Sequence, residues 1–178
     1  MIRNFLLTGP PGCGKTTVLR RVVERLDELR VAGFYTEEMR ERGRRVGFRA
    51  AGWNGGEAIL AHVDLVSEIR VGKYGVDPAA LAGLIASELG RPPADVDLYV
   101  VDEIGKMECY SPEFVAAVRR VLDAPSPVLA TVTLRDEGFP AEVKARRDAE
   151  LFVVSPANRD RLPPELAEKI RAVVGGCR

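Results

Sequence analysis

Short apolar runs alternate along this chain with longer amphipathic stretches. Five runs have the length and composition of buried strands, namely residues 5–8, 31–36, 98–101, 128–132 and 151–154. The stretches around them carry apolar residues three and four positions apart, the spacing of a helix that covers a sheet. These stretches predict helices at about 18–30, 77–89, 111–122, 141–147 and from 163 onward. Apolar strands that alternate with helices indicate an α/β fold with a mostly parallel sheet covered on both faces.

Two turn signals in succession interrupt this alternation. A glycine lies among charged residues at 41–44, and Asn54-Gly55 favours the positive φ values of a tight hairpin. The segments beside these turns, 45–51 and 58–63, have the composition of strands. The region at about 33–63 is therefore predicted to be an antiparallel meander inserted into the parallel sheet. The irregular, glycine-bearing segment that follows, residues 70–76, is predicted to be a loop.

A glycine-rich turn lies between the first predicted strand and the first predicted helix. Gly9, Gly14, Lys15 and Thr16 match the pattern G-x-x-x-x-G-K-[ST], the Walker A motif. In such a loop backbone N–H groups surround a polyphosphate, the lysine binds the β- and γ-phosphates, and the hydroxyl binds Mg²⁺. We therefore expect this loop to bind nucleoside triphosphate through Gly9, Pro10, Pro11, Gly12, Cys13, Gly14, Lys15, Thr16 and Thr17.

Two acidic residues end the apolar run at 98–101. Asp102 and Glu103 follow four apolar residues, which is the form of a Walker B strand. Because ligands of open α/β sheets bind at the carboxyl ends of the strands, we expect this pair to face the glycine-rich loop. Asp102 would then hold Mg²⁺ together with Thr16, and Glu103 would polarise an attacking water as general base. The predicted catalytic residues are Lys15, Asp102 and Glu103.

Composition narrows the classes of protein that fit this pattern. The chain has 178 residues, 46% hydrophobic and 29% charged, which suits a single globular domain over residues 1–178. Lys+Arg and Asp+Glu both number 26, so no net charge favours a nucleic-acid or membrane partner. No apolar run has the length of a membrane span, and the first residues lack the layout of a signal peptide. We expect a cytoplasmic monomer whose partners are nucleoside triphosphates.

The cysteines and the histidine offer no second chemistry. Cys13, Cys109 and Cys177 are odd in number and far apart, which argues against a disulfide framework and against a structural zinc site. Cys13 is interpreted as a small filler inside the glycine-rich loop, although a lowered thiol pKa there would permit redox control. The single histidine, His62, falls in the third strand of the predicted meander.

Several motifs together resemble one family of enzymes. They are residues 9–16, 33–38 and 71–77, the run Asp102-Glu103-Ile104-Gly105-Lys106-Met107-Glu108, and Asn158-Arg159-Asp160. The chain is similar over nearly its whole length to the small nucleoside-triphosphatases of bacteria and archaea, a group that includes the vertebrate cancer-related nucleoside-triphosphatase. The resemblance implies a three-layer P-loop NTPase fold of the RecA/AAA-related type. It also implies slow, Mg²⁺-dependent hydrolysis of several nucleoside triphosphates, with nucleotide contacts from the Walker A loop and from about residues 99–106, including Gly105 and Lys106.

Other polar residues are candidates for the same site. Lys106 can neutralise charge on the γ-phosphoryl group, or it can be a solvated loop lysine. Arg146 or Arg147 can supply an arginine finger, although cations at the end of a helix are also favoured by its dipole. Asn158 and Arg159 can contact the base or ribose, or they can belong to an ordinary loop before the last helix.

Basic and aromatic residues also gather in the predicted meander. Glutamates alternate with the arginines there, so we expect an exposed hairpin held by salt bridges rather than a nucleic-acid platform. A lid or a dock for a phosphoryl acceptor is the alternative. The residues concerned are Tyr35, Glu37, Glu38, Arg40, Glu41, Arg42, Arg44, Arg45, Phe48, Arg49 and Trp53.

The sequence therefore predicts a nucleoside-triphosphatase of broad base specificity, with two alternatives. The first is a kinase that uses the same loop to pass the γ-phosphoryl group to a nucleoside, a small metabolite or an RNA end. The second is an interaction module in which hydrolysis resets a partner-binding lid around the meander. The sequence predicts neither the preferred base nor the physiological partner.

Overall fold

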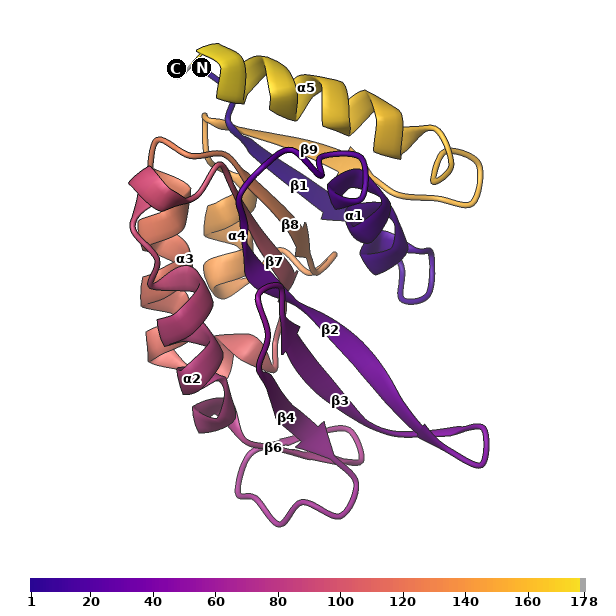
Figure 1. Cartoon of the computed structure of the whole chain (residues 1–178). Coiled ribbons are helices and arrows are strands. Elements are labelled where there is room, and N and C mark those ends of the chain that lie inside the picture. Colours follow the sequence, from indigo (N-terminus) through magenta and orange to yellow (C-terminus); the bar gives the residue numbers. More distant parts are fainter. Residues whose placement is uncertain (177–178) are drawn as a thin grey trace.

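The computed structural model describes residues 1–176 and places nine strands in one sheet (Figure 1). The strand order is β5-β6-β4-β3-β2-β7-β8-β1-β9. Five neighbouring strands are parallel, namely β1 (Asn4–Thr8), β2 (Val31–Glu41), β7 (Leu98–Ile104), β8 (Val128–Val132) and β9 (Ala149–Val153). Because β8 lies between β1 and β7, the strands that carry the two predicted motifs are one strand apart.

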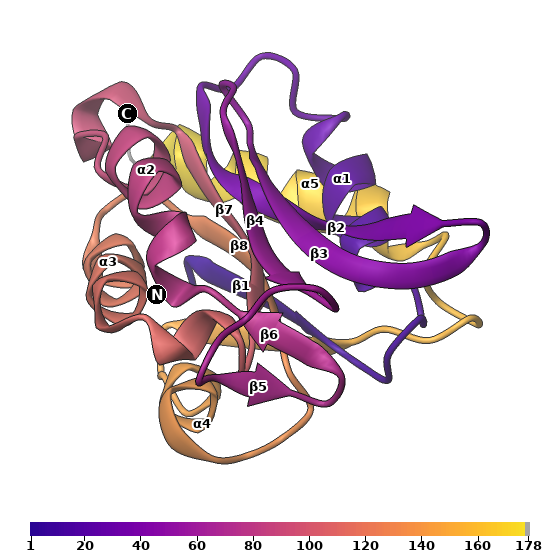
Figure 2. The same cartoon turned by 90° about the horizontal axis from the view of Figure 1, so that it is seen from below.

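Helices cover both faces of the parallel strands, which gives the expected three layers (Figures 1 and 2). One face packs against α1 (Lys15–Val23) and α5 (Leu162–Gly176). The other packs against a mixed helix of Pro78–Leu81, α2 (Ala82–Leu84) and Ile85–Leu89, and against α3 (Pro112–Asp123) and α4 (Gly138–Lys144). Short 3₁₀ turns occupy Pro93–Asp95 and Glu108–Tyr110. Successive strand residues enter opposite cores, as the side-chain period of two requires.

The predicted meander forms, and it is larger than expected. β2 pairs antiparallel with β3 (Arg44–Gly52), which pairs with β4 (Glu57–His62). The loop prediction for residues 70–76 is wrong, because β5 (Arg70–Val71) and β6 (Tyr74–Val76) form a further hairpin beside β4. Strands of two and three residues carry too little alternation to be recognised. The far part of the β2–β3 hairpin extends beyond the helical layers (Figure 1).

Two predicted helices have different bounds. The first ends at Val23 rather than near residue 30, and the chain continues in tight turns in which N–H groups bond to carbonyls three residues back. In these turns the apolar residues Leu26 and Leu29 keep a spacing of three positions, which is also a helical spacing and therefore extends the predicted helix. The helix predicted at 141–147 spans Gly138–Lys144 and accommodates Pro140 in its first turn, where a proline costs no hydrogen bond.

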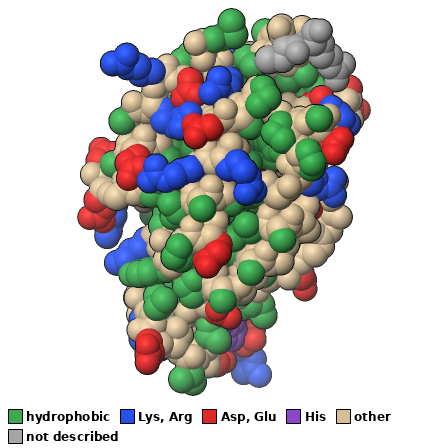
Figure 3. All heavy atoms as spheres, turned by 90° about the vertical axis from the view of Figure 1, so that its left-hand side faces the viewer, with side chains coloured by type: hydrophobic (Ala, Val, Ile, Leu, Met, Phe, Trp, Pro, Cys, Tyr) green, Lys and Arg blue, Asp and Glu red, His purple; other side chains and the backbone are tan. Residues whose placement is uncertain are grey.

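The surface shows no segregation of charge on the side formed by α2 and α3. Basic and acidic side chains are interspersed there with apolar ones (Figure 3). Within residues 1–176, no helix combines the length and the apolar character needed to cross a membrane.

A buried carboxylate joins the meander to the helical layer. Glu88 is 1% exposed. Its Oε2 accepts hydrogen bonds from the N–H of Gly33 at 3.0 Å and from Nδ2 of Asn54 at 2.9 Å. Its Oε1 accepts the backbone N–H of Asn54, also at 2.9 Å. One side chain thus satisfies donors on β2 and on the turn between β3 and β4.

Replacing Glu88 by glutamine is expected to lower the free energy of unfolding by about 1–3 kcal/mol, because an amide NH₂ would face a buried donor. Urea denaturation measures the change. Glu68→Gln, at an exposed position, is the matched control and should leave the midpoint unchanged. Equal midpoints for the two variants would show that the Glu88 hydrogen bonds contribute nothing.

Candidate active site

The glycine-rich loop leaves β1 and enters α1 through backbone conformations that suit glycine. Gly14, with φ of +106°, precedes the first residue of α1. Gly9 has φ of +154°, and a Cβ there would lie 2.7 Å from the carbonyl oxygen of Val154 and 2.8 Å from Sγ of Cys13. Both the conformation and the space therefore exclude a side chain at Gly9. The buried Cys13 thiol packs beneath the loop, in agreement with its interpretation as a filler.

The first residues of α1 bring two functional groups to the loop. The ammonium of Lys15 donates a hydrogen bond to the carbonyl oxygen of Gly9 at 3.1 Å. The hydroxyl of Thr16 donates to Oδ2 of Asp102 at 2.8 Å. The Walker A and Walker B segments, 86 residues apart in sequence, thus meet through a direct hydrogen bond.

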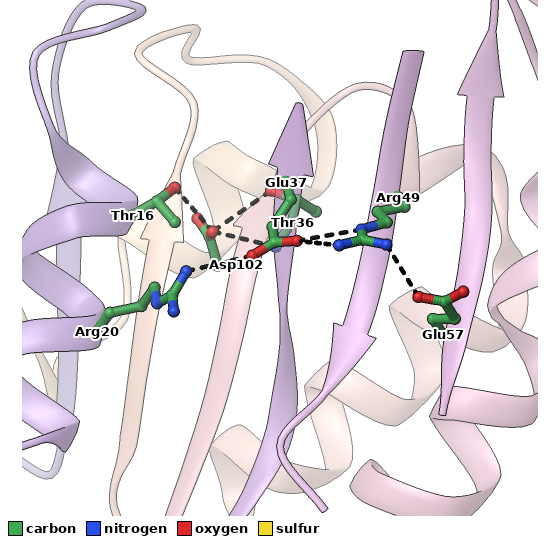
Figure 4. A network of polar contacts seen from close by, with 7 residues as sticks. All are labelled: Thr16, Arg20, Thr36, Glu37, Arg49, Glu57 and Asp102. Carbon is green, nitrogen blue, oxygen red and sulfur yellow. Dashed lines mark hydrogen bonds and ion pairs between the residues drawn. The ribbon is translucent and has the colours of Figure 1, made fainter. Parts of the chain in front are cut away.

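Asp102 is the centre of this contact and is 1% exposed (Figure 4). Its Oδ2 also accepts the backbone N–H and the hydroxyl of Thr36, each at 3.3 Å, and its Oδ1 accepts the hydroxyl of Thr131. Burial raises the pKa of Asp102, while the hydrogen bonds from Thr131, Thr16 and Thr36 oppose this rise. The two oxygens of this carboxylate and three threonine hydroxyls therefore lie together, supplied by three strands and one helix.

Thr36 and Thr131 belong to neither predicted motif, although the sequence carries a weak signal for both. Thr131 lies near the end of β8, and Thr36 lies on β2 two residues past its last pair with β7. These strands flank β7 on either side. The signal is a polar residue at the end of an apolar strand. Where that strand neighbours the Walker B strand, the residue is a candidate hydrogen-bond donor to the Walker B aspartate.

Glu103 shares a cleft with Lys15 at the carboxyl end of β7. Burial raises the pKa of Glu103, and the positive charge of Lys15 lowers it more than the neighbouring Asp102 raises it. The carboxylate is therefore within electrostatic reach of the ammonium. Glu103 does not point into the hydrophobic core.

The cleft has a volume of about 570 Å³ and two different walls. The Walker A loop and α1 form one wall, and the β2–β3 hairpin forms the other because β2 runs past the carboxyl edge of the parallel strands. The lining residues are Pro11, Gly12, Gly14, Lys15, Thr16, Thr17, Thr36, Glu37, Glu38, Arg45, Phe48 and Glu103.

The hairpin wall is held by ion pairs, as the alternation of charges predicted. Glu37 binds Arg20 of α1 at 3.2 Å and Arg49 of β3 at 2.9 Å, and Arg49 reaches Glu57 of β4 (Figure 4). Exposed pairs of this kind contribute little stability singly. Their geometry is informative, because the chain of pairs ties the hairpin to α1 beside Thr36.

Other predicted residues are not among those that line this cleft. Gly105 and Lys106 line a separate cavity of about 320 Å³. Arg159 lines a hollow of about 220 Å³ with Gly14 and Thr17. Asn158 instead stabilises its own loop, since its Nδ2 donates to the carbonyl oxygen of Val153 and its Oδ1 accepts the N–H of Ser155, both at 2.8 Å.

Arg146 and Arg147, the predicted arginine-finger candidates, do not line the cleft. The Arg146 guanidinium binds Asp148 and Asp123, each at 2.9 Å. The Asp148 carbonyl in turn accepts the N–H of Asn4, at the amino end of β1. A helix that follows a parallel strand returns the chain to the amino edge of the sheet, so the last turn of α4 lies at the edge opposite the Walker A loop. Arg147 is exposed beside it.

The described cysteines are free thiols. Burial raises the pKa of the Cys109 thiol to about 12. Cys177 lies outside the described residues.

A further buried acid lies in the 3₁₀ turn that follows the Walker B strand. Glu108 is 6% exposed. Burial raises its pKa to about 8, and the charges of Glu103 and Asp102 add to the rise, while hydrogen bonds from the N–H groups of Glu108 and Gly105 oppose it. The folded protein therefore keeps a proton on Glu108 that the unfolded chain releases.

This proton predicts a stability that depends on pH. The stabilising contribution is complete below the ordinary pKa of 4.5 and is lost as pH rises to about 8. The free energy of unfolding should fall across this window by up to about 1.4 kcal/mol per pH unit. Glu108→Gln, which carries no titratable proton, should flatten the slope in urea titrations from pH 5 to 9. An unchanged slope would assign the pH dependence to other groups.

Comparison with known proteins gives consistent matches over the whole site. A family profile described as NTPase matches residues 4–167. Nucleoside-triphosphatase THEP1 of Thermofilum pendens is 42% identical over 177 residues, with 97% of each chain covered. The crystal structure of THEP1 from Aquifex aeolicus superposes with a TM-score of 0.85 at 33% identity, covering 94% of this chain and 98% of that one. The solution structure of a human cancer-related nucleoside triphosphatase gives 0.80 at 34% identity, covering 96% and 98%.

Proposed function

The chain belongs to the NTPase family, and from this membership we propose that it is a Mg²⁺-dependent nucleoside-triphosphatase that releases phosphate with little preference for the base. The observation that carries the proposal is the single cleft that holds Lys15, Thr16 and Glu103, with Asp102 bonded to Thr16 beneath it. The resemblance expressed by the sequence motifs and the P-loop fold it implied are both confirmed by the family match and by the two solved structures.

The donor set between the two motifs suits Mg²⁺. The Thr16 hydroxyl and the Asp102 carboxylate are hard oxygen donors 2.8 Å apart, of the kind that this ion prefers. We assign the metal to these two residues, with Thr36 and Thr131 holding the carboxylate in place. Bound there, Mg²⁺ would neutralise charge on the β- and γ-phosphates.

The remaining roles follow from the position of each side chain in the cleft. Lys15 exchanges its hydrogen bond to Gly9 for the β- and γ-phosphate oxygens. Glu103 orients a water in line with the γ-phosphorus and accepts its proton. Burial raises the pKa of Glu103, and the charge of Lys15 opposes this rise and so favours the ionised form that a base requires.

Broad base specificity is supported by the hollow beside the loop. Gly14 and Thr17 line both this hollow and the cleft, so a nucleotide on the loop would place its ribose and base there. The hollow is also lined by Arg21, Arg159 and Asp160, with Arg21 and Asp160 paired at 2.8 Å. Its lining, as far as residues 1–176 show, contains no aromatic ring that would select among bases by stacking.

Phosphate release from four nucleoside triphosphates tests the proposal. With ATP, GTP, CTP and UTP in Mg²⁺, the values of kcat/KM should agree within about tenfold, a difference of about 1.4 kcal/mol. Excess EDTA should abolish release. Hydrolysis of a single base, or full turnover in EDTA, would contradict the proposed specificity or the proposed metal.

A further inference from the structure

The reaction proposed above develops negative charge on the γ-phosphoryl oxygens, and many P-loop enzymes add an arginine to stabilise it. Such a residue is worth about 10³–10⁵ in kcat. Arg146 and Arg147 lie at the wrong edge of the sheet. Among residues 1–176, the cleft lining contains one arginine, Arg45, and it comes from the inserted meander.

The Arg45 side chain is held in a defined position on the hairpin wall. Its Nε donates to the hydroxyl of Tyr74 at 3.0 Å, and its Nη1 donates to Oε1 of Glu38 at 2.7 Å. The guanidinium carbon lies 5.1 Å from the centre of the Phe48 ring. Nη2 has no hydrogen-bond partner within the described part of the chain. Three contacts thus fix the guanidinium and leave one of its nitrogens available.

The surroundings leave this end of the cleft positive. Glu38 is shared by two arginines, because Arg40 binds Oε2 while Arg45 binds Oε1. Two arginines and one glutamate carry a net charge of one positive unit, so the charge of Glu38 cancels only one of the two guanidinium charges. Hydrogen bonds to Glu38 and then to Tyr74 raise the pKa of Arg45 further, so the group stays charged.

We propose that Arg45 is an arginine finger supplied in cis by the meander, which donates from Nη2 to the γ-phosphoryl oxygens across the cleft from Lys15. The inference rests on the proposed function. In the step, a bond forms between the water oxygen and the γ-phosphorus, and the bond to the β–γ bridging oxygen breaks. Glu103 takes the water proton, the bridging oxygen leaves with the diphosphate, and Arg45 exchanges no proton.

The competing explanation is that Arg45 only holds the hairpin together. Arg49 provides a matched control, because it lies on the same strand and binds Glu37 and Glu57 in a similar way. Arg49 is not among the residues that line the cleft. A structural role predicts similar effects for the two arginines, whereas a finger predicts an effect confined to Arg45.

Arg45→Ala and Arg49→Ala are compared for turnover, for binding of a non-hydrolysable ATP analogue, and for binding of Mg²⁺–ADP–aluminium fluoride. Arg45→Ala is expected to lower kcat by about 10³-fold or more and to lose the planar fluoride complex. It should keep the affinity for the ATP analogue within a few-fold, and added guanidinium should restore part of its turnover. Arg49→Ala should resemble the unmodified protein in each assay.

The opposite results are equally clear. Equal turnover in the two variants overturns the inference, as does a parallel loss of kcat and of analogue affinity in Arg45→Ala. If Arg45→Ala does not fold, Arg45→Lys keeps the charge but not the forked geometry and should still lose the fluoride complex. An inactive unmodified protein would refute the proposed function, whereas an active protein with an active Arg45→Ala would refute the finger alone.

Discussion

A Glu103→Gln protein is expected to bind nucleoside triphosphate normally and to turn it over about 10²–10⁴ times more slowly. Glutamine keeps the size and polarity of the side chain but cannot accept the proton of the attacking water. Burial raises the pKa of this carboxyl group while the charge of Lys15 opposes the rise, whereas an amide has no ionised form that Lys15 could favour. Steady-state phosphate release gives kcat, and a fluorescent nucleotide analogue gives the dissociation constant.

Two controls make the Glu103 result interpretable. Glu68→Gln, at an exposed position away from the cleft lining, should leave both constants unchanged. Glu103→Asp, which keeps the acid but shortens the reach, should fall between the unmodified protein and the glutamine variant. Turnover by Glu103→Gln at the unmodified rate would remove Glu103 from the mechanism.

Lys15→Ala is expected to lose both affinity and turnover. Hydrogen bonds to charged groups contribute about 1.5–3 kcal/mol, so nucleotide binding should weaken by about 10- to 100-fold. The lysine also stabilises charge on the β- and γ-phosphates, and kcat should fall with the affinity. Titration calorimetry measures the binding, and phosphate release measures kcat/KM.

Lys169→Ala is the matched control for Lys15→Ala. Its ammonium pairs with Glu150 at 3.1 Å, on the outer strand β9, and it does not line the cleft. Both variants should unfold at similar temperatures without nucleotide, and the added nucleotide should stabilise Lys169→Ala alone. A Lys15→Ala protein that binds nucleotide as tightly as the control would show that the loop does not hold the phosphates through this residue.

The part of the site that sequence predicts best is the part built from contiguous residues. The Walker A loop needs glycines at fixed positions and a lysine at the start of a helix, so its structure follows from local rules. The same holds for Asp102 and Glu103, because a buried parallel strand ends at the ligand-binding edge wherever it lies in the sheet.

The rest of the site depends on how distant elements are placed. Thr36 and Thr131 bind Asp102 because β2 and β8 are the neighbours of β7 in the sheet. The sequence of a single strand does not predict which strands will lie beside it. Arg45 faces the loop because the β2–β3 hairpin runs past the sheet edge. Arg146 is the reverse case, because the basic end of its helix suggests a phosphate contact while the helix itself ends at the amino edge of the sheet.

Local packing also changed the elements that periodicity predicts. The stretch at 77–89 is apolar on one face, yet it forms 3₁₀, α and π turns in succession. Its last part places Glu88 against donors of β2 and the β3–β4 turn. A hydrophobic pattern predicts the apolar face of this stretch but does not distinguish among these helical backbones.

The central claim is that water, and no other acceptor, attacks a triphosphate held between the Walker A loop and the acid pair. Hydrolysis of ATP by the protein alone in ¹⁸O-labelled water, with mass spectrometry of the products, tests it directly. The account predicts one ¹⁸O atom in each released phosphate and none in ADP, with Glu103→Gln forming labelled phosphate about 10²–10⁴ times more slowly under the same conditions. ADP that forms only after a nucleoside or another hydroxyl acceptor is added, or label found in ADP, would contradict it.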